Sequence, residues 1–426
     1  MSLAAGRRRI FAITWITYAG FYFCRKNLGI VLPLLHGAAG LKSLELANVV
    51  FGYSVFYAFG QFGAGFLSDR VGPKRVVGAG LILVVLSNLL MGMGESLAWL
   101  LLFACLNGVG QSTGWSGLVK MMASWFDSAN RGVVMAWWGT NYVLGGFLAT
   151  LFATWSVGQA YILPQLAWRR GFLFPALVLL AVVAIFLVGV RDTPTVSSSE
   201  AETAFEKQQD RSTWADLLLL LRKRSLWMIS ISYFFLELCR YALMFWLPMY
   251  MMERLKYNVQ TAGYASSLYE LIGIVGALAA GYISDRFMQS RRAPVSVAML
   301  FGLAVVLLLH PWLANHGLIG TAIAISLAGM LSYGPDTLLS GAGAQDIGET
   351  KSAATAAGLV DGIGHLGALF SPYVVVFVSE RYGWDYLFFA FAGGAFLAGL
   401  VLIPIWKLTP VDHRNIPSEQ QALQGL

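Results

Sequence analysis

The sequence predicts an all-α membrane protein in which twelve transmembrane helices form two pseudo-symmetric six-helix bundles. Composition, recurring apolar stretches and an internal repeat together support this prediction. Of the 426 residues, 57% are hydrophobic and 12% are charged, whereas soluble domains carry about 25% charged residues. This is too little polar surface to cover a water-soluble globule of this size, so we expect the chain to lie in a lipid bilayer.

Apolar stretches that are long enough to cross a ~30 Å hydrocarbon core recur along the whole chain. Lipid offers no partners to backbone N–H and C=O groups, so these stretches should be helices. The first stretch is too long for a cleavable signal peptide. The expected spans are residues 10–35, 47–67, 76–94, 97–119, 132–155, 171–190, 226–251, 261–284, 295–313, 318–341, 353–378 and 384–406.

One long polar stretch, Arg191 to Arg224, divides the chain almost in half. We interpret residues 191–225 as a cytoplasmic linker. It would separate an N-terminal six-helix bundle (1–190) from a C-terminal one (226–407), which a cytoplasmic tail (408–426) would follow.

Loop charges predict the orientation. Most of the 29 lysines and arginines fall on one side if the N-terminus is cytoplasmic, which is the side that such residues favour. We therefore expect both termini to be cytoplasmic and the membrane to be a bacterial inner membrane. Topology accounts for the net charge of +7, so we expect no nucleic-acid partner, and we expect a functional monomer.

The two halves repeat short motifs. Gly-Phe-Leu-Ser-Asp-Arg, which begins at Gly65, returns as Gly-Tyr-Ile-Ser-Asp-Arg from Gly281, an offset of 216. Cys24-Arg25 returns as Cys239-Arg240, an offset of 215. Parallel internal repeats of this kind build transporters with a central site between two bundles.

The segment from Gly65 to Arg75 resembles the loop signature of the major facilitator superfamily. Its charged groups lie at helix ends, where they can pair in one conformation and separate in another, and so bias an inward/outward equilibrium. The alternative is that these charges only set topology. The gating candidates are Asp69, Arg70, Arg75, Asp285 and Arg286.

Arg25, Lys26 and Arg240 fall inside apolar spans. A mid-membrane Arg or Lys costs at least about 2.5–3.5 kcal/mol, so these side chains should face a central cavity. Two guanidinium groups, one from each half, match a dianion, while Lys26 is turned about 100° from Arg25 around its helix. Alternatively, the arginines neutralise internal acids, for which the candidates are Glu237, Glu270, Asp336 and Asp361.

A family resemblance covers nearly the whole membrane domain. Its motifs are Tyr18-Ala-Gly-Phe-Tyr-Phe-Cys-Arg-Lys-Asn27 with Pro33, Asn107 to Trp115, Leu238 to Tyr241, Tyr269-Glu270 and Ser332 to Pro335. Together these motifs resemble the organophosphate:phosphate antiporters, a family of glycerol-3-phosphate and hexose-phosphate carriers that includes a sugar-phosphate sensor.

The resemblance implies that Arg25 and Arg240 hold a substrate phosphate, which exchanges against inorganic phosphate by rocker-switch motion. It implies neither an enzyme nor a cofactor, and no histidine or cysteine spacing suggests a metal site. Tyrosines at four matching positions would line the cavity, and a tyrosine hydroxyl can donate to phosphate. These positions are Tyr18, Tyr22, Tyr57 and Tyr333.

The sequence also departs from the family pattern. Tyr142 stands where glycerol-phosphate carriers have a histidine, and Gln61 stands where many members have a lysine. His365 replaces a tyrosine one turn after Asp361, and Glu237 replaces an aromatic residue one turn before Arg240. The cavity thus loses a cation and gains acids.

Three interpretations of these acids stay open. They recognise a cationic or strongly hydrogen-bonding headgroup, they carry a coupling proton with His365, or they pair internally, Asp361 with His365 and Glu237 with Arg240. The leading function is secondary active exchange of a small organic phosphate ester for inorganic phosphate. The alternatives are a proton-coupled organic anion symporter and a non-transporting membrane sensor of phosphorylated sugar.

Overall fold

The structure, a computed structural model, describes residues 3–38, 40–126, 128–159, 161–192 and 214–408. In this part of the chain twelve helices have 19 residues or more, and no strand occurs. The long helices of the N-terminal half are α1 (Leu3–Ala38), α2 (Ser43–Val71), α3 (Pro73–Met91), α4 (Leu97–Trp125), α5 (Ser128–Gly158) and α6 (Arg170–Gly189). Those of the C-terminal half are α9 (Arg224–Glu253), α10 (Val259–Phe287), α11 (Arg292–Ala314), α12 (Gly317–Asp336), α13 (Ala344–Tyr382) and α14 (Trp384–Leu402).

Four short elements complete the described chain. A π-helical segment, η2 (Thr337–Gly343), joins α12 to α13. The others are the 3₁₀ helices η1 (Pro164–Arg169) and η3 (Ile403–Ile405) and the nine-residue helix α8 (Trp214–Arg222).

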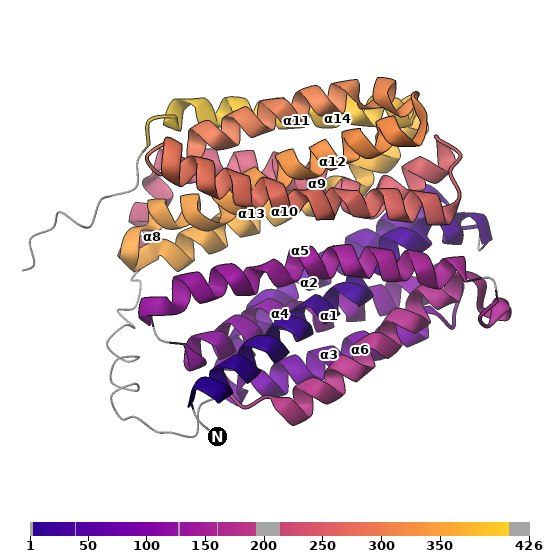
Figure 1. The fold of residues 1–426 in the computed structure, drawn as a ribbon, viewed down its shortest axis with the longest axis horizontal. Coiled ribbons are helices and arrows are strands. Elements are labelled where there is room, and N and C mark those ends of the chain that lie inside the picture. Colours follow the sequence, from indigo (N-terminus) through magenta and orange to yellow (C-terminus); the bar gives the residue numbers. More distant parts are fainter. Residues whose placement is uncertain (1–2, 39, 127, 160, 193–213, 409–426) are drawn as a thin grey trace, which may run out of the picture.

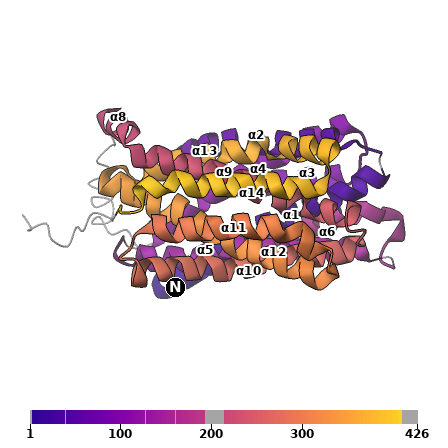
Figure 2. The same ribbon diagram turned by 90° about the horizontal axis from the view of Figure 1, so that it is seen from above.

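The long helices lie along one axis in two bundles, with α1–α6 below and α9–α14 above in Figure 1. The bundles share one neighbour pattern, since α1 packs on α5 and α6 while α9 packs on α13 and α14, and α4 packs on α2 and α3 while α12 packs on α10 and α11. Figure 2 shows from above that the long helices of both bundles share one direction. The predicted two-bundle fold is confirmed.

A close helix crossing recurs at the repeat offset. A Cβ atom added to Gly108 would lie 2.4 Å from the Tyr53 carbonyl oxygen, and one added to Gly329 would lie 2.1 Å from the Tyr269 carbonyl oxygen. The two tyrosines are themselves 216 residues apart. Each bundle therefore needs glycine at one point for two helix backbones to approach.

Nine of the described helices are both long and apolar enough to cross a membrane, and α1, α4 and α5 fall outside this group. These three lie within the bundle beside the others (Figure 1). Buried polar groups lie on all three of these helices, such as Arg25 on α1, Gln111 on α4 and Asn141 on α5.

The expected linker has one structured part among the described residues. Helix α8 lies inside the predicted range 191–225, and α9 begins at Arg224. The remainder of the linker, residues 193–213, and the tail from 409 to 426 lie outside the described residues, so the four predicted domain boundaries stay predictions.

Among the described residues, the halves are joined by side-chain contacts in the middle of the bundle and at one of its ends. We call the end where α2 finishes, α3 begins and α8 lies the linker side. At the opposite side the Tyr373 hydroxyl donates to Asn48 Oδ1 at 3.0 Å, and Gln260 Nε2 donates to the Gly158 carbonyl at 3.2 Å. These bonds join α13 to α2 and α10 to α5.

The close crossing predicts a large effect of added volume. In Gly329→Val the side chain would collide with the α10 backbone, so we expect a loss of about 1–3 kcal/mol or more. This should appear as a lower melting temperature of the detergent-purified protein. Gly393→Val is the matched control, since nothing lies within 4 Å of a Cβ atom at that exposed position. Equal melting temperatures for the two variants would contradict the crossing.

Candidate functional site

Helix α1 bends in the middle of the membrane layer, at Cys24, whose φ and ψ are −100° and 16°. A bend frees backbone carbonyls, which need donors inside a bilayer. Asn107 Nδ2 donates to the Cys24 carbonyl at 2.9 Å, Asn88 Nδ2 lies 3.5 Å from the same oxygen, and Gln111 Nε2 donates to the Phe21 carbonyl at 2.9 Å. Side-chain amides from α3 and α4 therefore hold the bend.

Arg25 follows the bend directly and is 6% exposed. Its Nε donates to Gln111 Oε1 at 3.3 Å, and its guanidinium carbon lies 4.7 Å from the ring centroids of both Tyr22 and Tyr57. Its Nη2 is fully buried and has no hydrogen-bond partner among the described residues. A buried donor without a partner is costly, so Arg25 has unused capacity to bind an anion.

Arg240, the counterpart of Arg25 in the second half, has different surroundings. Its Nη1 donates to Glu237 Oε1 and to Asp336 Oδ1, the latter at 2.6 Å. The Tyr233 hydroxyl donates to the same Asp336 oxygen at 2.9 Å, and the Tyr333 ring lies 4.7 Å from the guanidinium carbon. The structure thus contains the pairing expected between Glu237 and Arg240, with Asp336 as a second acid. Arg240 Nε is buried and unpaired within the described chain.

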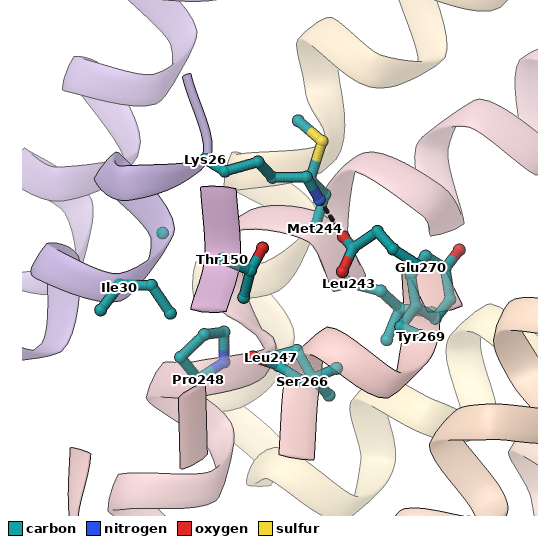
Figure 3. A pocket seen from close by; sticks show the side chains of 11 residues that line it. Lys26, Ile30, Thr150, Leu243, Met244, Leu247, Pro248, Ser266, Tyr269 and Glu270 are labelled. Atoms are coloured by element: carbon teal, nitrogen blue, oxygen red, sulfur yellow. Dashed lines mark hydrogen bonds and ion pairs between the residues drawn. The ribbon is translucent and has the colours of Figure 1, made fainter. Parts of the chain in front are cut away.

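Lys26 forms an ion pair across the two halves with Glu270 of α10. Both side chains are almost fully buried, at 3% and 4% exposure. Figure 3 shows the ammonium group extending to the Glu270 carboxylate above a small pocket that Thr150 and Ser266 also line. In this conformation the charge of Lys26 is therefore neutralised by Glu270.

Aromatic rings continue the site from one half to the other. Tyr57 of α2 stacks on His365 of α13 with ring centroids 6.0 Å apart, and Tyr142 of α5 stacks on Tyr333 of α12 at 6.5 Å. The structure thus brings together Arg25, Tyr57 and His365 on one side and Arg240, Tyr333 and Tyr142 on the other.

Other predicted residues lie at the edges of this site. His365 Nδ1 lies 2.9 Å from the Asp361 backbone oxygen and 3.5 Å from Oδ2 of its carboxylate, whose side chain is 42% exposed. Tyr18 packs against Trp115, with ring centroids 5.3 Å apart. Gln61, one turn after Tyr57, is partly buried. The expected Asp361–His365 pair is present.

The gating candidates of the second half make one observed pair. Asp285 pairs with Arg292 of α11, whose Nε donates to Asp346 of α13 at 3.2 Å. Burial raises the pKa of the Asp346 carboxyl group. These contacts join helices of one half on the linker side, while Arg286 is exposed. The sequence did not identify Arg292 and Asp346 as members of this charged cluster. Their charged side chains, next to the ends of apolar spans, were the signal that could have indicated them.

The first half differs in this region. The Arg70 guanidinium lies 4.1 Å from the centroid of the Phe66 ring, and Arg75 is exposed. The side chain of Asp69 lies outside the described residues. A gating role for this loop stays a prediction.

Groupings suited to metal or redox chemistry do not occur in the part of the chain that the structure describes. There, no three His, Cys, Asp or Glu side chains come together in a way that could hold a metal ion. Cys24, Cys105 and Cys239 are free thiols.

The fold and the buried charged site between two repeats define a membrane transporter. The profile of the Major Facilitator Superfamily matches residues 14–360, and the chain belongs to that superfamily. A crystal structure of a bacterial homologue of the human lysosomal transporter Spinster, inward-facing and unoccupied, has the same fold, with a TM-score of 0.72 at 15% identity over 94% of this chain and 96% of that one.

Closer relatives narrow the assignment. The chain is 31% identical to the glycerol-3-phosphate transporter of Bacillus subtilis (strain 168), over 94% of this chain and 92% of that protein. It is 27% identical to a probable hexose phosphate transport protein of Chlamydia trachomatis, over 96% and 93%. It is also 27% identical to the membrane sensor protein UhpC of Salmonella typhimurium, over 93% and 91%. These relatives match the organophosphate:phosphate antiporter family, and the protein is a multi-pass transporter rather than an enzyme.

The buried pair between the halves predicts a specific stability pattern. Lys26→Met would leave Glu270 charged and unpaired, which costs about 3–5 kcal/mol, whereas an apolar replacement of both partners is often close to neutral. We expect a lower melting temperature for Lys26→Met and recovery in the double variant with Glu270→Met. A single variant as stable as the unmodified protein would contradict the buried pair.

Proposed function

We propose that the protein exchanges a small organic phosphate ester, of the sugar phosphate or glycerol phosphate type, for inorganic phosphate. The observation that carries this proposal is the buried, unpaired Nη2 of Arg25 between the halves. Guanidinium groups match phosphate oxygens in geometry and stay charged at any relevant pH. The relatives named as glycerol-3-phosphate and hexose phosphate transporters support the same chemistry.

In this proposal the phosphate lies between Arg25 and Arg240. Arg25 offers Nη2, and Arg240 offers Nε, which the acids leave unpaired. Hydroxyl and amide groups would donate to the remaining phosphate oxygens or to the organic part. Lys26 would contribute from the neighbouring α1 position in the state in which its pair with Glu270 is broken. The proposed contributors are Tyr18, Tyr22, Tyr57, Tyr142, Tyr333, Gln61 and His365.

Alternating access would follow from the way the halves meet. The Lys26–Glu270 pair and the Tyr373–Asn48 bond cross between the halves. Both would have to break for a substrate to reach the site from the side opposite the linker. We propose that the charged loops around Asp69 and Asp285 bias the equilibrium between the two states.

The proposed setting is the bacterial inner membrane, with both termini and the linker in the cytoplasm. Loop lysines and arginines support this orientation. We propose a functional monomer, since the site is built from the two halves of one chain.

A proton-coupled organic anion symporter is the second candidate. It is favoured by Glu237 and Asp336 on one guanidinium and by the Asp361–His365 pair. A coupled proton would relieve the excess of carboxylates. A sensor without net transport is a third candidate, and the relative named as a membrane sensor protein supports it.

Counterflow distinguishes these candidates. Proteoliposomes loaded with inorganic phosphate should take up labelled phosphate esters and release phosphate in exchange, without an imposed pH gradient. Uptake that follows a pH gradient and releases no phosphate would replace antiport with symport. Binding without any flux would favour the sensor.

The arginine clamp makes a second prediction for the same assay. Arg25→Lys and Arg240→Lys keep the charge but lose the planar fork, so exchange should fall about 100-fold or more, which corresponds to about 3 kcal/mol. Insertion and melting temperature serve as folding checks. Arg381→Lys is the matched control, because Arg381 lies at the end of α13 against Phe377 and Tyr382. Exchange at the unmodified level in either site variant would remove the clamp.

A further inference from the structure

The acids around Arg240 indicate a substrate that carries a second charged group besides its phosphate. We propose that the transported ester also carries a primary ammonium group, which Glu237 and Asp336 bind while Arg25 and Arg240 Nε bind its phosphate. This inference rests on the proposed phosphate exchange and narrows its substrate class.

The charge of the site is the first argument. Lys26 is paired with Glu270, and Arg240 is paired with two carboxylates. Among the described residues, Arg25 is therefore the one cation of the site that has no carboxylate partner. Asp361 adds a further acid beside His365. A simple dianionic ester would therefore enter a buried site with no net positive charge, where uncompensated charge is expensive. An ammonium group on the same molecule reduces that cost.

The geometry of the two acids is the second argument. Glu237 Oε1 and Asp336 Oδ1 both accept from the same nitrogen of Arg240. Glu237 Oε2 and Asp336 Oδ2 have no partner among the described residues, yet neither is among the fully buried unpaired atoms. Each carboxylate thus keeps one oxygen without a hydrogen-bond partner among the described residues, and the two acids come from different helices, α9 and α12.

A primary ammonium group fits this arrangement because it has three N–H donors. Two donors can reach the free carboxylate oxygens, and the Tyr333 ring, which already lies against Arg240, offers an aromatic face to a cation. A coupled proton would occupy one acid and would not use an acceptor on both. A quaternary ammonium has no N–H and would lose those bonds.

The test compares esters that differ only in this group. In proteoliposomes loaded with phosphate, 2-aminoethyl phosphate should exchange about tenfold more efficiently than 2-hydroxyethyl phosphate, measured as kcat/KM. Choline phosphate should be weaker than the primary amine. Equal efficiencies, or a preference for the hydroxyl ester, would overturn this inference and leave phosphate exchange standing. If neither of these esters, nor glycerol 3-phosphate, nor a hexose phosphate exchanges with inorganic phosphate, the proposed function itself fails.

Two variants assign the preference to the acids. Glu237→Gln and Asp336→Asn should each lower the ratio of amino to hydroxyl ester toward one. Glu253→Gln is the matched control and should keep the ratio, because Glu253 lies away from the site, where it accepts from Trp384 Nε1 at 3.1 Å. A preference that survives in both site variants would overturn the assignment. A second outcome would also overturn it: the variants change the pH dependence of exchange equally for both esters and leave the ratio of amino to hydroxyl ester constant. That outcome is expected if the acids carry a coupled proton.

Discussion

A guanidinium group in the middle of a bilayer has to be compensated, and Arg25 shows how this protein meets that requirement. Gln111 accepts one of its N–H groups, and the rings of Tyr22 and Tyr57 lie against its charge. The bend at Cys24 comes directly before Arg25, and amides from α3 and α4 stabilise its free carbonyls. A buried amide of α4 and two tyrosine rings therefore help to keep this cation buried. An anion would supply the compensation that is still missing.

The two halves share a scaffold and differ in chemistry. The crossings at Gly108 and Gly329 are equivalent, and Arg25 and Arg240 occupy equivalent helices. Around Arg25 the partners are an amide and aromatic rings, whereas around Arg240 they are two acids. A symmetric pair of bundles suits alternating access, because either side can open around a fixed site. The asymmetric site then allows a ligand with two different ends.

Much of the fold was predictable, because a chain that crosses lipid has to pair its backbone groups within helices. The repeat offset then divides these helices into two sets. The arginine positions and the Glu237–Arg240 and Asp361–His365 pairs followed from helix spacing. The partner of Lys26 could not be predicted, because Glu270 lies 244 residues away and meets it only through packing of α1 on the other half. Asn88 and Gln111 were missed as supports of the bend, since nothing in the sequence marks a bend at Cys24. Helix α8 was missed because its nine residues lie within a polar stretch.

The central claim is that the unpaired guanidinium nitrogen of Arg25 is an anion site shared by the two halves. An experimental structure of the protein with inorganic phosphate bound tests this claim most directly. The account predicts phosphate oxygens within hydrogen-bond distance of Arg25 Nη2, with Arg240 on the opposite side of the ligand. Phosphate bound elsewhere, with no contact to Arg25, would contradict it.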